Sequence, residues 1–115
     1  MLPKNFRLRK NADFRKIYSS KSKSIADPYL VLYIRKNHSQ NNPRIGFSIS
    51  KKLGKAHERN HLKRQLREIA RKNLKSIKPG YDLIFIARQK ISGKGYRDIE
   101  KSMEFLLKKG RIINE

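Results

Sequence analysis

The chain has 115 residues, which is enough for one domain with one modest hydrophobic core. Its 30 Lys and Arg against nine Asp and Glu give a formal net charge of +21, and such a surplus points to nucleic acid or an anionic membrane as partner. The lack of cysteine excludes disulfides, thiolate metal sites and a thiol nucleophile.

A membrane partner is disfavoured by the distribution of apolar residues. The longest apolar run, Tyr29 to Ile34, is far too short to span a bilayer, and the N-terminal ten residues lack the apolar region of a signal peptide. We therefore expect a cytoplasmic protein whose partner is nucleic acid, and the sequence shows no evident protein partner.

The N-terminal part of the chain combines basic and aromatic residues. Residues 1–10 are predicted to form a basic arm, and a short helix is predicted over about 11–19. In that helix Phe14, Ile17 and Tyr18 share one face. Spacing alone favours packing of this face in the core, and the alternative is that its rings stack on unpaired bases.

Two strands are predicted next, after a polar loop and a short edge strand near residues 24–26. Tyr29 to Lys36 is rich in β-branched and aromatic residues, and its Leu30, Leu32 and Ile34 are predicted to face the core. The run His38 to Pro43 is interpreted as a hairpin loop.

The strand predicted over Arg44 to Ser50 alternates between an apolar face and a small polar face. Ile45, Phe47 and Ile49 point one way, whereas Arg44, Gly46, Ser48 and Ser50 point the other. The polar face, flanked by Tyr33, would form either a shallow open cleft or an ordinary solvent-facing sheet surface.

The most basic segment runs from Lys51 to Lys75, with ten Lys or Arg residues against two acids. A helix is predicted over about 56–74, and one apolar stripe on it would face the core: Leu62, Leu66, Ile69 and Ala70. The opposite side carries guanidinium groups and an amide within about 60° of one another: Asn60, Arg64, Arg67 and Arg71.

A merely solvated helix face usually mixes the two signs of charge, because like charges one turn apart destabilise a helix. The three arginines of this face, Arg64, Arg67 and Arg71, are expected to have no counter-charge of their own. Their repulsion is explained if a polyanion occupies the face, so we interpret it as a nucleic-acid interface.

The last two elements complete an α+β domain. Tyr81 to Ala87 is nearly all apolar, as expected for an inner strand, and a crossover through the basic helix would make it parallel to the strand ending at Ser50. A final helix over Tyr96 to Lys109 would bury Ile99, Met103, Leu106 and Leu107, with Gly110 as its C-terminal cap.

One motif suggests a metalloenzyme. His57-Glu58-Arg59-Asn60-His61 matches the H-E-x-x-H pattern of zinc proteases. A catalytic zinc needs a third protein ligand, and no histidine follows His61. We therefore expect no zinc, interpret both histidines as polar residues near the start of the basic helix, and predict that His57 contacts phosphate. The remaining acids do not cluster, so no catalytic residue is expected in the protein.

The pattern Lys51-Lys52, Gly54-Lys55-Ala56, Arg59-Asn60, Lys63-Arg64, Arg67-Glu68 resembles the signature of the bacterial ribonuclease P protein family. The resemblance extends through RLRK at 7–10, the Asp13-Phe14 pair and Tyr18 over nearly the whole chain. It implies a single-domain αβββαβα two-layer sandwich with a central four-stranded sheet. It also implies a left-handed βαβ crossover, against the general rule.

The resemblance further implies a function. Proteins of this family bind a catalytic RNA subunit that removes the 5′ leader from precursor tRNA by hydrolysis with Mg²⁺, which is bound mainly by RNA. The residues implied to contact that RNA lie in and before the basic helix: Lys51, Lys52, Lys55, Arg59, Asn60, Lys63, Arg64 and Arg67. A cleft for the leader is implied at Phe14, Tyr18 and Tyr33, which makes Phe14 and Tyr18 ligand-facing. The alternative that composition leaves open is a purely structural ribosomal or nucleoid protein.

Overall fold

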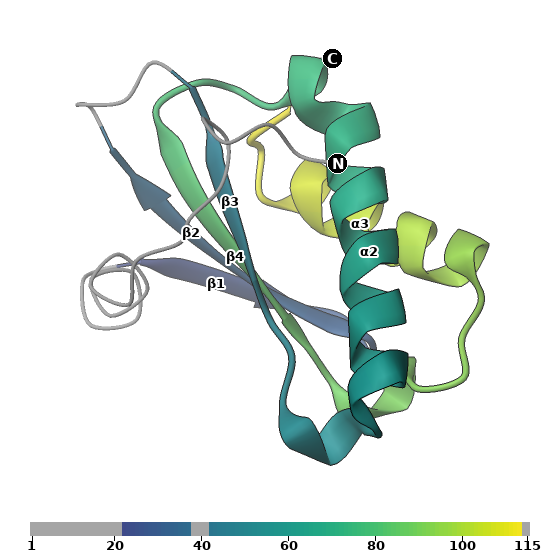
Figure 1. The fold of residues 1–115 in the computed structure, drawn as a ribbon. Helices are drawn as coiled ribbons and strands as arrows, with labels where there is room; N and C mark the ends of the chain where they lie inside the picture. The colour runs from purple at the N-terminus through teal and green to yellow at the C-terminus, as the bar shows by residue number, and fades with distance from the viewer. Residues whose placement is uncertain (1–21, 38–41, 114–115) are drawn as a thin grey trace.

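The computed structural model describes residues 22–37 and 42–113, which form two layers, a four-stranded sheet with two long helices on one side of it (Figure 1). The strands are β1 (Lys23–Ala26), β2 (Leu30–Lys36), β3 (Arg44–Ser48) and β4 (Tyr81–Ala87), and the helices are α2 (Ala56–Asn73) and α3 (Tyr96–Lys109). Short 3-10 turns occur at η2 (Lys51–Leu53), η3 (Leu74–Ser76) and η4 (Gln89–Ile91). The predicted α+β class and four-stranded sheet are confirmed. The basic arm and the helix predicted over 11–19 lie outside the described residues.

The order of strands in the sheet is β1-β2-β4-β3. β4 pairs antiparallel with β2 and parallel with β3, so the predicted inner strand and its parallel partner are confirmed. The hairpin predicted between β2 and β3 is wrong, because β4 lies between them. β4 is the most apolar strand and occupies an inner position, with a neighbouring strand on each side. The left-handed sense of the β3–α2–β4 connection stays a prediction.

The core lies between the sheet and the two helices. Strand residues of one face, such as Leu32, Ile45 and Phe85, are almost fully buried against Leu66 of α2 and Leu106 of α3. The rings of Phe47 and Phe85, paired across the parallel strands, lie 6.0 Å apart. The predicted alternation in β2 and the predicted buried stripes of both helices are confirmed, except that Leu62 is only partly buried.

The end of α3 shows why a glycine stands at residue 110. Gly110 caps the helix as predicted, but its φ is −75°, so the position does not need the left-handed conformation usual at such caps. A Cβ at Gly110 would lie 2.7 Å from Cδ1 of Ile34 and 3.2 Å from the carbonyl oxygen of Leu106. The glycine therefore suits the close approach of the helix end to the side chain of Ile34 on β2.

None of the helices in residues 22–37 and 42–113 is both long and apolar enough to cross a membrane. This agrees with the short apolar runs of the sequence.

Candidate nucleic-acid interface

The basic helix α2 begins at a turn that gathers three lysines. The side chain of Ser50 accepts a hydrogen bond from Lys52 N at the start of η2, and Gly54 follows with a φ of 131°, which disfavours any side chain. The carboxylate of Glu58 then accepts the N–H of Lys55 at 3.2 Å and covers the space in which a Cβ at Gly54 would lie. One acid thus closes the helix start while Lys51, Lys52 and Lys55 stay exposed.

These lysines surround the positive end of the α2 dipole. Backbone N–H groups at a helix start carry a partial positive charge, and cations placed there are unfavourable in the free protein. Arg59 adds a further cation, and its Nε donates to the carbonyl of Gly54 at 3.1 Å. An anion bound at this end would relieve the repulsion among these groups.

A hollow of about 520 Å³ borders the exposed side of α2 next to the core stripe. Within the described part of the chain it is lined by Asn60, Lys63, Arg64, Arg67 and Glu68. Four of these are residues that the sequence assigned to RNA contact. Because the core residues Leu66, Ile69 and Ala70 fix the rotation of the helix, the structure brings these donors together on one accessible surface.

The expectation that the three arginines lack counter-charges is wrong for Arg71. Its guanidinium donates to both carboxylate oxygens of Glu68, at 2.5 and 3.4 Å. The hydrogen bond with Arg71 lowers the pKa of Glu68, and the same bond raises the pKa of Arg71. Among the described residues, no carboxylate lies within salt-bridge distance of Arg64 or Arg67. Arg64 and Arg67 thus have no carboxylate partner in the described part of the chain, which is the property on which the interface hypothesis depends.

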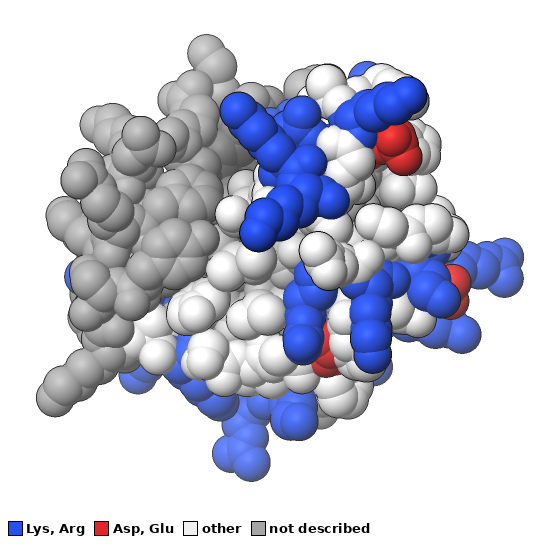
Figure 2. All heavy atoms as spheres, turned by 90° about the horizontal axis from the view of Figure 1, so that it is seen from below, with Lys and Arg blue, Asp and Glu red and all other residues white. Residues whose placement is uncertain are grey.

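Figure 2 views the end of the molecule at which η2 and the start of α2 lie. Lys and Arg side chains project in several groups around the described surface on this side, and the few carboxylates lie next to them. A surface of this kind attracts polyanions over distances of about 10 Å at moderate salt. The excess of positive charge in the composition is therefore exposed on this side of the described structure.

The sheet face opposite the helices carries the candidate leader cleft. Tyr33 of β2, Ile84 of β4 and Gly46 of β3 are neighbours in the strand register, and Val31, Ile86 and Ser48 form the next row. Ile84 and Ile86 pack with Tyr33 in a small apolar cluster separate from the main core. Tyr33 is thus on the face predicted for it, whereas Phe14 and Tyr18 lie outside the described residues.

The same face holds a polar cluster that the sequence did not predict. Asp82 is almost fully buried and accepts two hydrogen bonds from Arg44, at 3.0 and 2.9 Å, and one from Asn37 at 2.9 Å. Arg44 and Asp82 stand opposite each other in the β3–β4 register. The two strands were predicted to be parallel, but the register that places Arg44 opposite Asp82 is visible only in the structure.

The H-E-x-x-H motif does not form a metal centre with other described residues. In residues 22–37 and 42–113, no group of three His, Cys, Asp or Glu side chains is placed to hold a metal ion. Glu58, the base of the motif, is engaged by the backbone of Lys55. His57 and His61 instead line a pocket with Leu53, Leu62 and residues 91–94.

Comparison with known proteins identifies the family of this chain. The family model described as Ribonuclease P matches residues 2–111. The ribonuclease P protein component of Alkaliphilus oremlandii is 47% identical over 94% of this chain and 93% of its own length, and that of Clostridioides difficile is 48% identical over 91% of each.

Solved structures agree with this assignment. The RNase P protein of Staphylococcus aureus superposes with a TM-score of 0.88 at 38% identity, over 95% of this chain and 98% of that one. The RNase P protein of Thermotoga maritima gives a TM-score of 0.81 at 36% identity, over 90% of this chain and 96% of that one. From the matched family model, the relatives and the shared fold together, the chain belongs to the ribonuclease P protein family.

Proposed function

We propose that this chain is the RNA-binding protein subunit of ribonuclease P and assists a catalytic RNA in removing the 5′ leader from precursor tRNA. The relatives named above are components of that endoribonuclease. The family favours this function over the structural ribosomal or nucleoid protein that composition alone also allowed.

The observation that carries the proposal is the hollow on α2. Its guanidinium and ammonium groups are held on one side of a helix whose other side is fixed in the core. Guanidinium groups bind phosphate oxygens with two parallel hydrogen bonds, and the amide of Asn60 adds donors and an acceptor of its own. We assign contact with the RNA subunit to this hollow, to the lysines of the η2 turn, and to Arg59 and Arg71.

The sheet face around Tyr33 is proposed to hold the single-stranded leader. A ring beside apolar side chains stacks on any base, which suits a segment whose sequence differs from one precursor to the next. Glycine and serine on the same face of β3, beyond β4, leave room for the backbone of a nucleic acid strand to approach. Phe14 and Tyr18 are assigned to the same function by the family resemblance alone.

The chemistry of the site fits a supporting function. Ammonium and guanidinium groups do not ligate Mg²⁺, and the carboxylates that do are not gathered in the described part of the protein. The described residues therefore do not suit a Mg²⁺ site of their own. We propose that the RNA holds the metal and activates water, while the protein neutralises phosphates and positions the leader.

The test is reconstitution with the catalytic RNA and measurement of precursor tRNA cleavage at low Mg²⁺. The protein should increase the cleavage rate, and the same preparation should bind precursor tRNA more tightly than mature tRNA. Tyr33→Ala should reduce that preference while leaving affinity for the RNA subunit unchanged. If the protein gives no stimulation at any Mg²⁺ concentration, the proposed function is wrong.

A further inference from the structure

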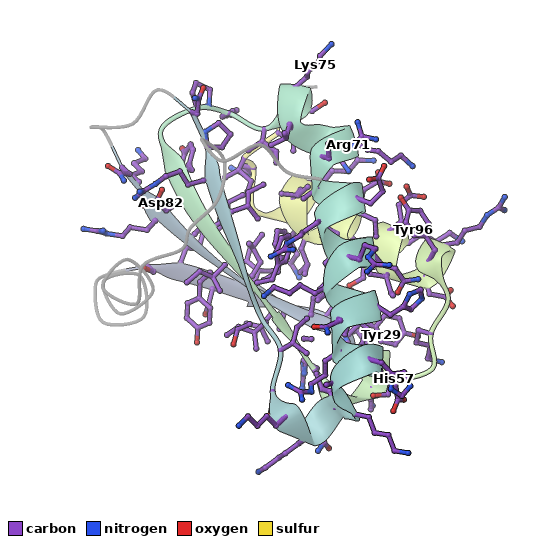
Figure 3. All side chains as sticks on the ribbon, viewed as in Figure 1. Tyr29, His57, Arg71, Lys75, Asp82 and Tyr96 are labelled. Carbon is purple, nitrogen blue, oxygen red and sulfur yellow. The ribbon has the colours of Figure 1, made fainter. Side chains whose placement is uncertain are left out.

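The two histidines of the H-E-x-x-H motif line a second, smaller pocket, which among its described lining residues shares only Arg59 with the RNA contacts proposed above. The pocket has a volume of about 330 Å³ and lies between the first turns of α2 and the turn that follows η4. At 100° per residue, His61 and Gln65 lie about 60° or more around α2 from Arg64 and Arg67, whereas His57 lies only about 20° from Arg64. In Figure 3, His57 lies at the start of α2, beside the connection that leads to α3.

The floor of this pocket is apolar. Leu53 of η2 and Ile91 of η4 are nearly buried, and Leu62 of α2, which was expected to be fully in the core, is only partly covered. An apolar floor is unnecessary for binding of a simple anion, which needs only charge and hydrogen-bond donors. The apolar floor instead suits a flat ring system, such as a nucleic-acid base, which is stabilised when it is buried away from water.

The rim of the pocket is polar and mostly basic. Arg59 and Lys94 bring permanent positive charges, and Ser92 adds a hydroxyl group. Lys94 Nζ also lies 5.6 Å from the centre of the ring of Tyr29, which is not among the described residues that line the pocket. Among the lining residues that the structure describes, the one carboxylate, Glu58, already accepts the N–H of Lys55. The rim therefore favours a negatively charged group.

We propose that this pocket binds a single unstacked nucleotide of RNA, with the base on the apolar floor between the histidine rings and the phosphate at Arg59 and Lys94. RNA-binding proteins commonly hold splayed bases against aromatic, histidine or arginine side chains. The volume is at the lower end of the range of about 300–1,000 Å³ typical of ligand pockets, which fits one nucleotide.

The location of the pocket agrees with the RNA contacts proposed above for the lysines of η2. Leu53 lines the pocket and directly follows the exposed lysines of η2, so a strand whose phosphates contact Lys51 and Lys52 passes the pocket entrance. The proposal rests on the RNA-binding function proposed above. It adds to that function a pocket that holds one unstacked base of the bound RNA. A bound metal is disfavoured because Arg59 and Lys94 repel a dication.

The experiment is NMR titration of the full-length protein with adenosine monophosphate and, at matched ionic strength, with inorganic phosphate. The ring signals of His57 and His61 and the amide signals of Ser92, Gly93 and Lys94 should move together and saturate. The midpoint for the nucleotide should be about tenfold lower than that for phosphate, since a stacked base contributes at least about this factor. Equal midpoints, or no movement in these two groups of signals, would overturn the proposal.

Two variants and a control locate the interaction. The double variant His57→Ala/His61→Ala, at two exposed positions, should raise the nucleotide midpoint about tenfold, as reported by the Gly93 amide. Lys94→Ala should raise it severalfold, whereas Lys75→Ala, which removes the same charge at the opposite end of α2, should leave it unchanged (Figure 3). Unchanged midpoints in both pocket variants would refute the assignment. The proposed function is tested independently, because stimulation of cleavage by the wild-type protein does not depend on this titration.

Discussion

The hollow on α2 allows a quantitative prediction about salt. Each Lys or Arg contact with a phosphate contributes about 0.7 to 0.9 to the slope of log affinity against log salt concentration. Three cations line the hollow, so the triple variant Lys63→Ala/Arg64→Ala/Arg67→Ala should lower the slope by about 2.1 to 2.7. When the salt concentration rises fourfold, the affinity of both proteins should fall. The fall should be about 20- to 40-fold larger for the wild type than for the variant.

The assay is equilibrium binding of labelled RNA subunit at a series of monovalent salt concentrations with constant Mg²⁺. A variant matched in charge is Arg97→Ala/Lys101→Ala/Lys108→Ala, which removes three cations from the exposed side of α3. The control tests whether the effect is local, because long-range attraction depends on total charge. If both triple variants change the slope equally, the cations of the hollow make no specific phosphate contacts and the reasoning is refuted.

Three further predictions concern the acids and the packing around the site. Glu68→Gln removes a negative charge from the hollow and should tighten RNA binding about two- to fivefold. The effect should be the same from about pH 6 to 8, because Arg71 lowers the pKa of Glu68 and the wild-type carboxylate is ionised over this whole range. Weaker binding by the variant would contradict this. Gly110→Ala should destabilise the fold by about 1–2 kcal/mol in thermal unfolding, and less in an Ile34→Val background that lacks the clashing methyl; equal costs would exclude the clash. Asp82→Ala should lower the free energy of unfolding in urea by about 3 kcal/mol, since Arg44 loses its buried partner, and an unchanged midpoint would refute that.

Some features of the interface follow from the sequence by itself. The apolar period in residues 56–74 fixes which side of α2 is buried, and therefore which cations remain outside. The alternation in β2 likewise places Tyr33 on the face away from the core. These predictions succeeded because they depend on local geometry, 100° per helical residue or two residues per strand repeat, and on the requirement that apolar groups leave water.

The Glu68–Arg71 pair shows a signal that was present in the sequence and was not used. The two residues are three apart on a helix, a spacing at which opposite charges meet. The expectation of unpaired arginines should therefore have been limited to Arg64 and Arg67. The interface hypothesis needed those two, so the correction narrows the predicted site without removing it.

Other features were decided only by the tertiary structure. The short connection between β2 and β3 suggests that they are neighbours, but β4 lies between them. The choice of neighbour depends on how completely each strand can be buried in the finished sheet. The Arg44–Asp82 pair depends in turn on the β3–β4 register, and the histidine pocket depends on η4 returning to the start of α2. Contacts between residues some 30 or 40 positions apart arise from the competition of whole elements for the same core, and neither periodicity nor residue spacing records the outcome of that competition.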